Sequence, residues 1–310
     1  MSRDFALVLA TSLLLAAVVA MPSSVIADAP PGFYDGVLGL TSDTLRSGLH
    51  DLIDHHRKLR YSDIWGVLIE AHPHPVTPTL VLDIYRNHGY KPGSHTSGGA
   101  DEPWNREHAW PKSHGFPDED EGAPCNVPYT DAHLLFPADL GYNSSRQDAP
   151  YDECLGCEPR PVDGFPETPN RRSKAPQPEA WEVWPGRRGD IARAMFYVDV
   201  RYQGDTQGTV GRGGRPCREP DLILTDDRSK IHPTGIVTGT AFMGVLTTLI
   251  RWHFEDEVDD RERFRQEVIA RPDWQGNRSS FVDRPDLVCA VWLGNASCRR
   301  FHAVLPMVWR

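Results

Sequence analysis

The stretch WNREHAWPKSHGF, from Trp104 to Phe116, decides the fold that this sequence predicts. It sets a carboxylate directly before an imidazole, in Glu107 and His108, and a Trp-Pro pair follows at once. Successive side chains on a strand point to opposite faces, so two adjacent residues normally share no task. A twist or bulge at the end of the strand would let both side chains approach one site. We therefore expect a strand that ends where Glu107 and His108 reach a common ligand.

The segment TDAHLLFPADLGYNSSR, residues 130–146, supplies the partner of this strand. Pro137 is expected to open a helix, because proline is favoured in the first helical turn. Asn143 and Arg146 lie three positions apart and would be neighbours on that helix. A strand that ends in an acid and a base, followed by a helix with an amide, is the layout of a ββα-metal finger. In such a finger, a hairpin and a helix hold one divalent ion.

The residue types suit that purpose. Glu107 offers an anionic oxygen and Asn143 a neutral one, which are ligands that Mg²⁺ prefers, and positions remain open for water and phosphate. A histidine titrates near neutral pH, so His108 is the candidate to take a proton from an attacking water.

Taken together, these segments resemble the bacterial endonuclease I family of secreted and periplasmic nucleases, within the His-Me finger (ββα-metal) superfamily. They follow the family's order from about Leu49 to Val288. The resemblance implies an endonuclease that hydrolyses phosphodiester bonds of DNA, and also of RNA, largely independently of sequence and leaves 5′-phosphate ends. The segments that carry it are REHAWPKS, DAHLLFPAD with the following Asn143 and Arg146, GDIARAMFYVDVRY, LIRWHFEDEVDDRERFRQEVI and QGNRSSFVDRP.

The resemblance also implies roles for single residues. Glu107 and Asn143 are expected to hold one divalent cation, Mg²⁺, with Mn²⁺ or Ca²⁺ as alternatives. His108 is expected to be the general base. Asp131 and His133 fall on supporting positions of the finger.

Basic residues near the substrate phosphate are harder to assign. Arg146 falls on a catalytic position near the phosphate, and Lys112 and Arg278 are further candidates for phosphate contacts. Some relatives place an arginine between the catalytic histidine and the metal-binding asparagine, and this chain has none there. Leu134 also stands where the family often has a second histidine.

The N-terminus has the layout of a secretory signal peptide. Arg3 precedes an apolar run over residues 5–20, and Val25-Ile26-Ala27 offers a cleavage site. A membrane anchor is the alternative, but the run is short for a span. We expect residues 1–27 to be removed and residues 28–310 to form one secreted or periplasmic nuclease domain without membrane contact.

Cysteine usage agrees with export. An even number of cysteines in an exported chain predicts three disulfides, with fifteen possible pairings. Cys289 and Cys298 would close a short loop and are one candidate pair. Half of a zinc knuckle at Cys154 and Cys157 is the alternative, but no second CxxC matches it. The cysteines are Cys125, Cys154, Cys157, Cys217, Cys289 and Cys298.

Helical and strand patterns mix without βαβ regularity, which favours a single α+β domain, stabilised by disulfides, around the metal finger. The net charge of −10 argues against nucleic-acid affinity over the whole surface, although arginines cluster between residues 171 and 215. We expect a monomer with DNA and RNA as partners and no stable protein partner. A zinc-dependent hydrolase and a non-catalytic nucleic-acid-binding protein are the alternatives. Apolar spacing predicts helices over 42–61, 62–68, 190–202 and 240–256, and a strand over 79–86.

Overall fold

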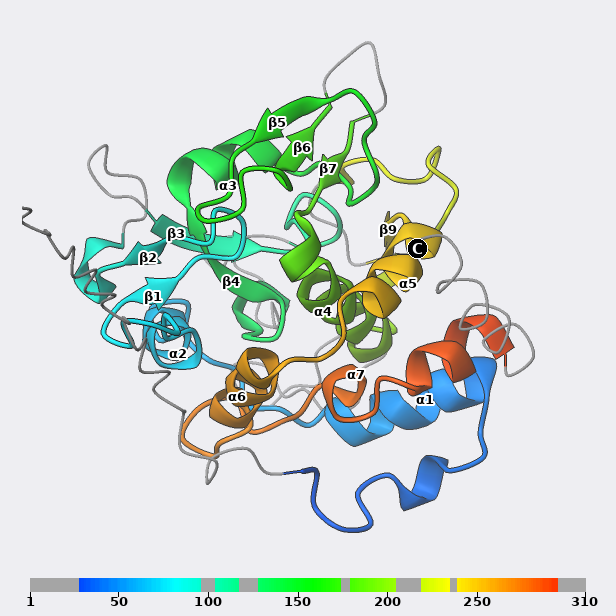
Figure 1. Cartoon of the computed structure of the whole chain (residues 1–310). Coiled ribbons are helices and arrows are strands. Elements are labelled where there is room, and N and C mark those ends of the chain that lie inside the picture. Colours follow the sequence, from blue (N-terminus) through cyan, green and yellow to red (C-terminus); the bar gives the residue numbers. More distant parts are fainter. Residues whose placement is uncertain are drawn as a thin grey trace, which may run out of the picture.

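In a computed structural model of the chain, helix α4 (Arg188–Arg201) runs through the centre of the molecule (Figure 1). It is buried from Gly189 to Arg201, although it carries several charges. A buried charge is tolerated when it is paired and hydrogen-bonded, and these charges pair with residues of other elements. The pairs are Arg193 with Glu262, Asp199 with Arg46, and Arg201 with Glu219. Two arginines from the basic middle of the chain, Arg193 and Arg201, therefore have their charges paired inside the fold.

The structure describes residues 28–95, 104–116, 128–173, 179–204, 219–234 and 239–294. The expected signal peptide and Cys125, Cys217 and Cys298 lie outside these residues. The other helices are α1 (Ser42–Ile53), α2 (Ile64–Ala71), α3 (Leu140–Arg146), α5 (Leu246–Glu255), α6 (Asp260–Ile269) and α7 (Ser280–Asp283). The strands are β1 (Val81–Leu82), β2 (Gly89–Tyr90), β3 (Trp104–His108), β4 (Leu135–Asp139), β5 (Glu158–Arg160), β6 (Asn170–Arg172), β7 (Trp181–Glu182), β8 (Asp221–Leu224) and β9 (Thr240–Met243). Short 3₁₀ turns lie at Asp35–Val37, Pro92–Ser94, Pro128–Thr130 and Pro185–Arg187, and a π-helical turn lies at Cys289–Leu293.

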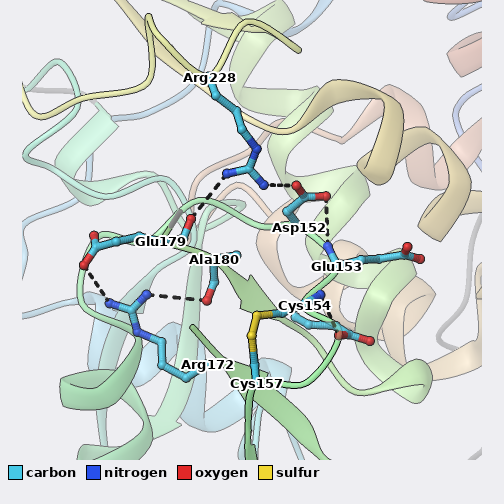
Figure 2. Close-up of a disulfide and its surroundings, with 9 residues drawn as sticks. Asp152, Glu153, Cys154, Cys157, Arg172, Glu179, Ala180 and Arg228 are labelled. Atoms are coloured by element: carbon cyan, nitrogen blue, oxygen red, sulfur yellow. Dashed lines mark hydrogen bonds and ion pairs between the residues drawn. A yellow bond between two sulfur atoms is a disulfide. The ribbon is translucent and has the colours of Figure 1, made fainter. Parts of the chain in front are cut away.

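The expected single α+β domain with a disulfide is confirmed. Strands pair as β1–β2, β3–β4, β5–β6–β7 and β8–β9, and one large hydrophobic core reaches from Tyr34 to Val291. Cys154 and Cys157 form a disulfide just before β5 (Figure 2), so they are not half of a zinc knuckle. Cys289 is disulfide-bonded as well. None of the helices in the described part of the chain has the length and apolar character of a membrane span.

Strands β3 and β4 form an antiparallel pair, and α3 follows β4 without a loop, beside both strands (Figure 1). The register sets Glu107 opposite Phe136 and His108 opposite Leu135. The helix begins at Leu140, not at Pro137 as the sequence predicted.

The later helix start has a local cause. The Asp139 side chain accepts hydrogen bonds from the backbone N–H groups of Gly141 and Tyr142, at 2.8 and 3.2 Å, and so caps α3. Pro137 remains in the strand, opposite Arg106, and its carbonyl accepts the backbone N–H of Ile84 at 2.9 Å.

Other expected elements are shorter than predicted, although α2 and α4 lie where expected. The helix expected over 42–61 ends at Ile53, and the strand expected over 79–86 is only Val81–Leu82. The helix expected over 240–256 is divided, because its first residues form β9, which pairs in parallel with β8. Tertiary pairing therefore overrides the helical spacing of apolar residues there.

Arg265 on α6 binds the backbone just before β4. This buried guanidinium donates hydrogen bonds to the carbonyls of Ala132 and His133, both at 2.8 Å. It also lies over the ring of Phe136, 4.3 Å from the centroid. Because a buried carbonyl without a donor is costly, Arg265 fixes the chain that leads into the β3–β4 pair.

We predict that Arg265→Leu lowers the free energy of unfolding by about 2–4 kcal/mol, because buried carbonyls lose their donors. Urea denaturation of the mature chain measures this loss. Arg263→Leu, at a half-buried position of the same helix, is the matched control and should change stability by less than about 0.5 kcal/mol. Equal effects of the two substitutions would contradict the prediction.

Candidate active site

A cleft of about 570 Å³ opens where β3 ends. Glu107, His108 and Asn143, which the sequence singled out, all line it. The other lining residues are Tyr61, Arg106, Pro111, Lys112, Ser113, Tyr129, Gln147 and Asp148.

The Glu107 carboxylate is held by hydrogen bonds from Tyr85 and Arg146. Its side chain is buried, and Oε1 accepts hydrogen bonds from the Tyr85 hydroxyl at 2.7 Å and from Arg146 Nη1 at 2.9 Å. The Tyr85 hydroxyl also bonds the Tyr151 hydroxyl at 2.8 Å. Burial raises the pKa of the Glu107 carboxyl, and the charge of Arg146 and the Tyr85 hydroxyl oppose that rise. No described residue bonds Oε2, which leaves that oxygen for a ligand in the cleft.

Arg146 is fully buried, and its guanidinium is committed to several acceptors. Besides Glu107, it donates to the carbonyls of His108 and Ala109 at 2.8 Å and of Ala149 at 3.2 Å. A contact between Arg146 and a substrate phosphate stays a prediction. These bonds support a different task, because they position Glu107 and fix the backbone just after it.

His108 has a defined tautomer. Its Nε2 lies 2.9 Å from the carbonyl oxygen of Tyr129. Because a carbonyl can only accept, Nε2 carries the proton, and in the neutral ring Nδ1 keeps the lone pair. The ring also stacks on Tyr129, with 4.9 Å between centroids, and Tyr129 contacts Tyr61 at 4.4 Å. The Tyr129 residue thus orients His108 by both its backbone and its ring.

Asn143 presents an oxygen from α3. Its Nδ2 donates to Asn105 Oδ1 at 2.8 Å, and no described residue bonds its Oδ1. Glu107 Oε2 and Asn143 Oδ1 therefore have no hydrogen-bond partner in the part of the chain that the structure describes. Both residues line one cleft, and this donor set fits a hard divalent cation. The described residues contain no group of three or more His, Cys, Asp and Glu side chains that could hold a metal. A cation held here would keep several waters, as Mg²⁺ does.

Asp131 and His133 lie just before β4 and do not line the cleft. Asp131 is buried and accepts hydrogen bonds from the hydroxyls of Tyr197 and Tyr202, at 2.9 and 2.7 Å. Burial lowers the pKa of His133 to about 4, and its Nε2 bonds the carbonyl of Asn277 at 3.1 Å. Their supporting role stays a prediction, and their position just before β4 is compatible with it.

The two candidates for phosphate contacts lie in different places. Lys112 is exposed and lines the cleft. Arg278 does not line it and forms ion pairs with Glu267 and Asp283, each at 2.7 Å. The geometry therefore favours Lys112 over Arg278.

Sequence reasoning missed Tyr85 and Arg106. The Arg106 guanidinium lies 3.3 Å from the Tyr61 ring centroid and 4.0 Å from that of Trp65, and the residue lines the cleft. A basic residue directly before Glu107 was a readable signal. Tyr85 gave no such signal in the sequence, because it lies 22 positions from Glu107 in a segment whose pattern indicates only a strand.

Comparisons with known proteins bear on this site. The model of the family described as Endonuclease I matches residues 41–286. An extracellular ribonuclease of Bacillus subtilis (strain 168) is 34% identical over 275 residues, which is 88% of this chain and 82% of the relative. An extracellular ribonuclease of Bacillus amyloliquefaciens is 34% identical over 261 residues, 84% of this chain and 78% of the relative.

We predict that Arg146→Leu lowers the free energy of unfolding by about 3–5 kcal/mol at pH 8, because a buried carboxylate loses its cation. Without Arg146, the pKa of Glu107 should rise further above its ordinary value of 4.5. The folded state then binds more protons than the unfolded state, so the stability deficit grows as pH rises above that value. Urea denaturation at pH 5 and pH 8 checks the sign, and an equal deficit at both would contradict it.

Proposed function

The chain belongs to the endonuclease I family, and we propose that it is an exported, metal-dependent nuclease that hydrolyses phosphodiester bonds of DNA and RNA. Membership of the family makes it a nuclease. The metal-dependent mechanism is supported by one observation: Glu107, Asn143 and the oriented imidazole of His108 line the same cleft. Export is supported by the extracellular relatives and by the signal-peptide layout of residues 1–27, ahead of a nuclease domain at 28–310.

In this proposal β3, β4 and α3 act as the ββα-metal finger. Glu107 and Asn143 would hold one divalent cation, Mg²⁺ being the best match to one carboxylate oxygen, one amide oxygen and several waters. The bound cation would neutralise negative charge that develops on the phosphate oxygens. Arg146 and Tyr85 keep Glu107 turned into the cleft.

His108 supplies the base. Its Nδ1 takes a proton from a water that attacks phosphorus in line with the leaving 3′ oxygen, while Nε2 stays bonded to the carbonyl of Tyr129. The bond between phosphorus and the 3′ oxygen breaks, the 3′ oxygen takes a proton from a water, and the phosphate stays on the 5′ end of the other product. Lys112 and Arg106 contribute positive charge that attracts the backbone.

Both nucleic acids are proposed as substrates. The relatives named extracellular ribonucleases support RNA, and the resemblance to endonuclease I supports DNA. Contacts to phosphate carry affinity without base information, which supports largely sequence-independent cutting. The family match supports a nuclease over the zinc-dependent hydrolase.

The decisive experiment combines metal removal with loss of the base. EDTA should abolish degradation of plasmid and of single-stranded RNA, and Mg²⁺ should restore it. His108→Ala should lower the rate by about 10²–10⁴-fold, as expected for a lost general base. His55→Ala, at an exposed histidine outside the cleft, is the control and should stay within about twofold of wild type.

Calorimetric titration with Mg²⁺ separates the two roles. His108→Ala should bind Mg²⁺ as wild type does, whereas Glu107→Gln should lose that binding because the charged oxygen is gone. Wild-type cleavage by folded His108→Ala protein would defeat the assignment of the base.

Substrate binding is predicted to depend on Lys112. Lys112→Ala should weaken binding of a fluorescent single strand in EDTA and lower the slope of log affinity against log salt by about one. Arg278→Ala should leave that slope unchanged, because Arg278 does not line the cleft. Fluorescence anisotropy at several salt concentrations measures both, and the reverse ranking would overturn the placement of the phosphate contact.

A further inference from the structure

A second cavity, of about 430 Å³, lies beside the cleft and shares Asp148 with it. This volume falls within the roughly 300–1,000 Å³ of ordinary small-ligand pockets. Its lining residues are His114, Asp148, Pro150, Glu179, Arg228, Ser229, Ile231 and Pro233. The metal-dependent mechanism uses none of them.

His114 points an acceptor into this cavity. The residue is only 2% exposed, and its Nδ1 lies 3.2 Å from the carbonyl oxygen of Phe242. The carbonyl can only accept, so Nδ1 carries the proton and Nε2 keeps the lone pair. No described residue bonds Nε2, and His114 lines the cavity, so this nitrogen can accept from a ligand or a water there.

Asp148 adds a second acceptor at the border with the cleft. Its Oδ2 accepts the Ser113 hydroxyl at 3.2 Å, and no described residue bonds its Oδ1. The cavity thus presents an imidazole nitrogen and a carboxylate oxygen, both of which need donors.

Among the lining residues that the structure describes, Arg228 alone has a fixed positive charge, and its guanidinium is already engaged. Arg228 pairs with the Asp152 carboxylate and donates to the carbonyl of Glu179 at 3.4 Å (Figure 2). Figure 2 also shows Asp152 next to the chain that leads to the Cys154–Cys157 disulfide, so the cation is fixed in the wall. Pro150, Ile231 and Pro233 supply apolar wall.

These features select the chemistry of the ligand. A carboxylate repels phosphate, so the cavity does not suit the backbone of a nucleic acid. Apolar walls suit the flat face of a base, and two acceptors suit a base edge with N–H donors. Guanine has adjacent donors at N1 and at its 2-amino group, which can both bond one carboxylate in charge-assisted hydrogen bonds.

Resting on the proposed nuclease function, we propose that this cavity is a base subsite that takes an unpaired guanine of the substrate, with Asp148 accepting from N1 and the 2-amino group. That edge of guanine is used in Watson–Crick pairing, so only a single-stranded or unwound substrate can enter. Asp148 borders both cavities, so the guanine lies at a fixed short distance from the scissile phosphate. Phosphate contacts alone would make cleavage independent of sequence, and the subsite adds a preference for a guanine at one position near the cut.

The test measures binding of three nucleotides to the mature chain in EDTA by calorimetry. GMP should bind about tenfold more tightly than IMP, which lacks the 2-amino group, because a hydrogen bond to a charged acceptor is lost. UMP should bind no better than IMP. The shared phosphate cancels in these ratios, so they report on the base alone.

Asp148→Asn should reduce the preference for GMP over IMP to within about twofold, because the charged acceptor becomes an amide. Glu158→Gln, at an exposed carboxylate outside the cavity, is the matched control and should keep the wild-type ratio. Cleavage mapping on a random single-stranded library gives a second readout. Guanine should be enriched at one fixed position near the cut for wild type and lose that enrichment for Asp148→Asn.

Equal binding of GMP, IMP and UMP by wild-type protein overturns the subsite even when cleavage is intact. So does an unchanged preference for GMP in Asp148→Asn. If wild-type protein cleaves nothing with Mg²⁺ but still selects GMP through Asp148, the nuclease mechanism fails and the base site stands. The two proposals therefore fail by different observations.

Discussion

The burial of one ionised carboxylate constrains the whole site. Glu107 lies at the end of β3, almost without solvent contact, and a charge in that position is tolerated only when it is paired and hydrogen-bonded. Its partners come from distant parts of the chain: Tyr85 follows β1, and Arg146 ends α3. The fold must bring both to the same oxygen, and in doing so it leaves the other oxygen toward the cleft. Packing, electrostatics and the proposed chemistry thus depend on the same hydrogen bonds.

The buried arginines follow the same rule, that a buried charge must be paired and hydrogen-bonded. Most of the arginines that the structure describes between residues 171 and 201 pair with acids, as Arg193 does with Glu262 around α4. They stabilise the interior and are not available to a nucleic acid. The net charge of −10 adds general repulsion, so the proposed binding of a nucleic acid relies on local positive charge, such as that of Lys112 and Arg106 at the cleft. Local charge at the site matters more here than the charge of the whole chain.

The sequence was informative where function constrains neighbouring residues and less so where tertiary contacts decide. The meeting of Glu107, His108 and Asn143 in one cleft could be anticipated from REHAWPKS and the segment after it. The start of α3 could not, because an aspartate cap competed with the proline signal. The 240–256 segment has helical spacing, yet its first part pairs with a strand. Tyr85 was beyond reach, because only the folded chain brings its hydroxyl to Glu107.

The pairing of Glu107 with Phe136 and of His108 with Leu135 has an evolutionary consequence. In a strand the side-chain period is two, so a shift of one residue sends every side chain to the opposite face. An insertion or deletion within β3 would remove the acid from its clamp and the imidazole from its carbonyl in one event. Neighbouring loops can vary in length, but this hairpin can change only by substitution. Among descendants of this chain, we therefore expect the lengths of β3 and β4 to vary less than the lengths of the neighbouring loops.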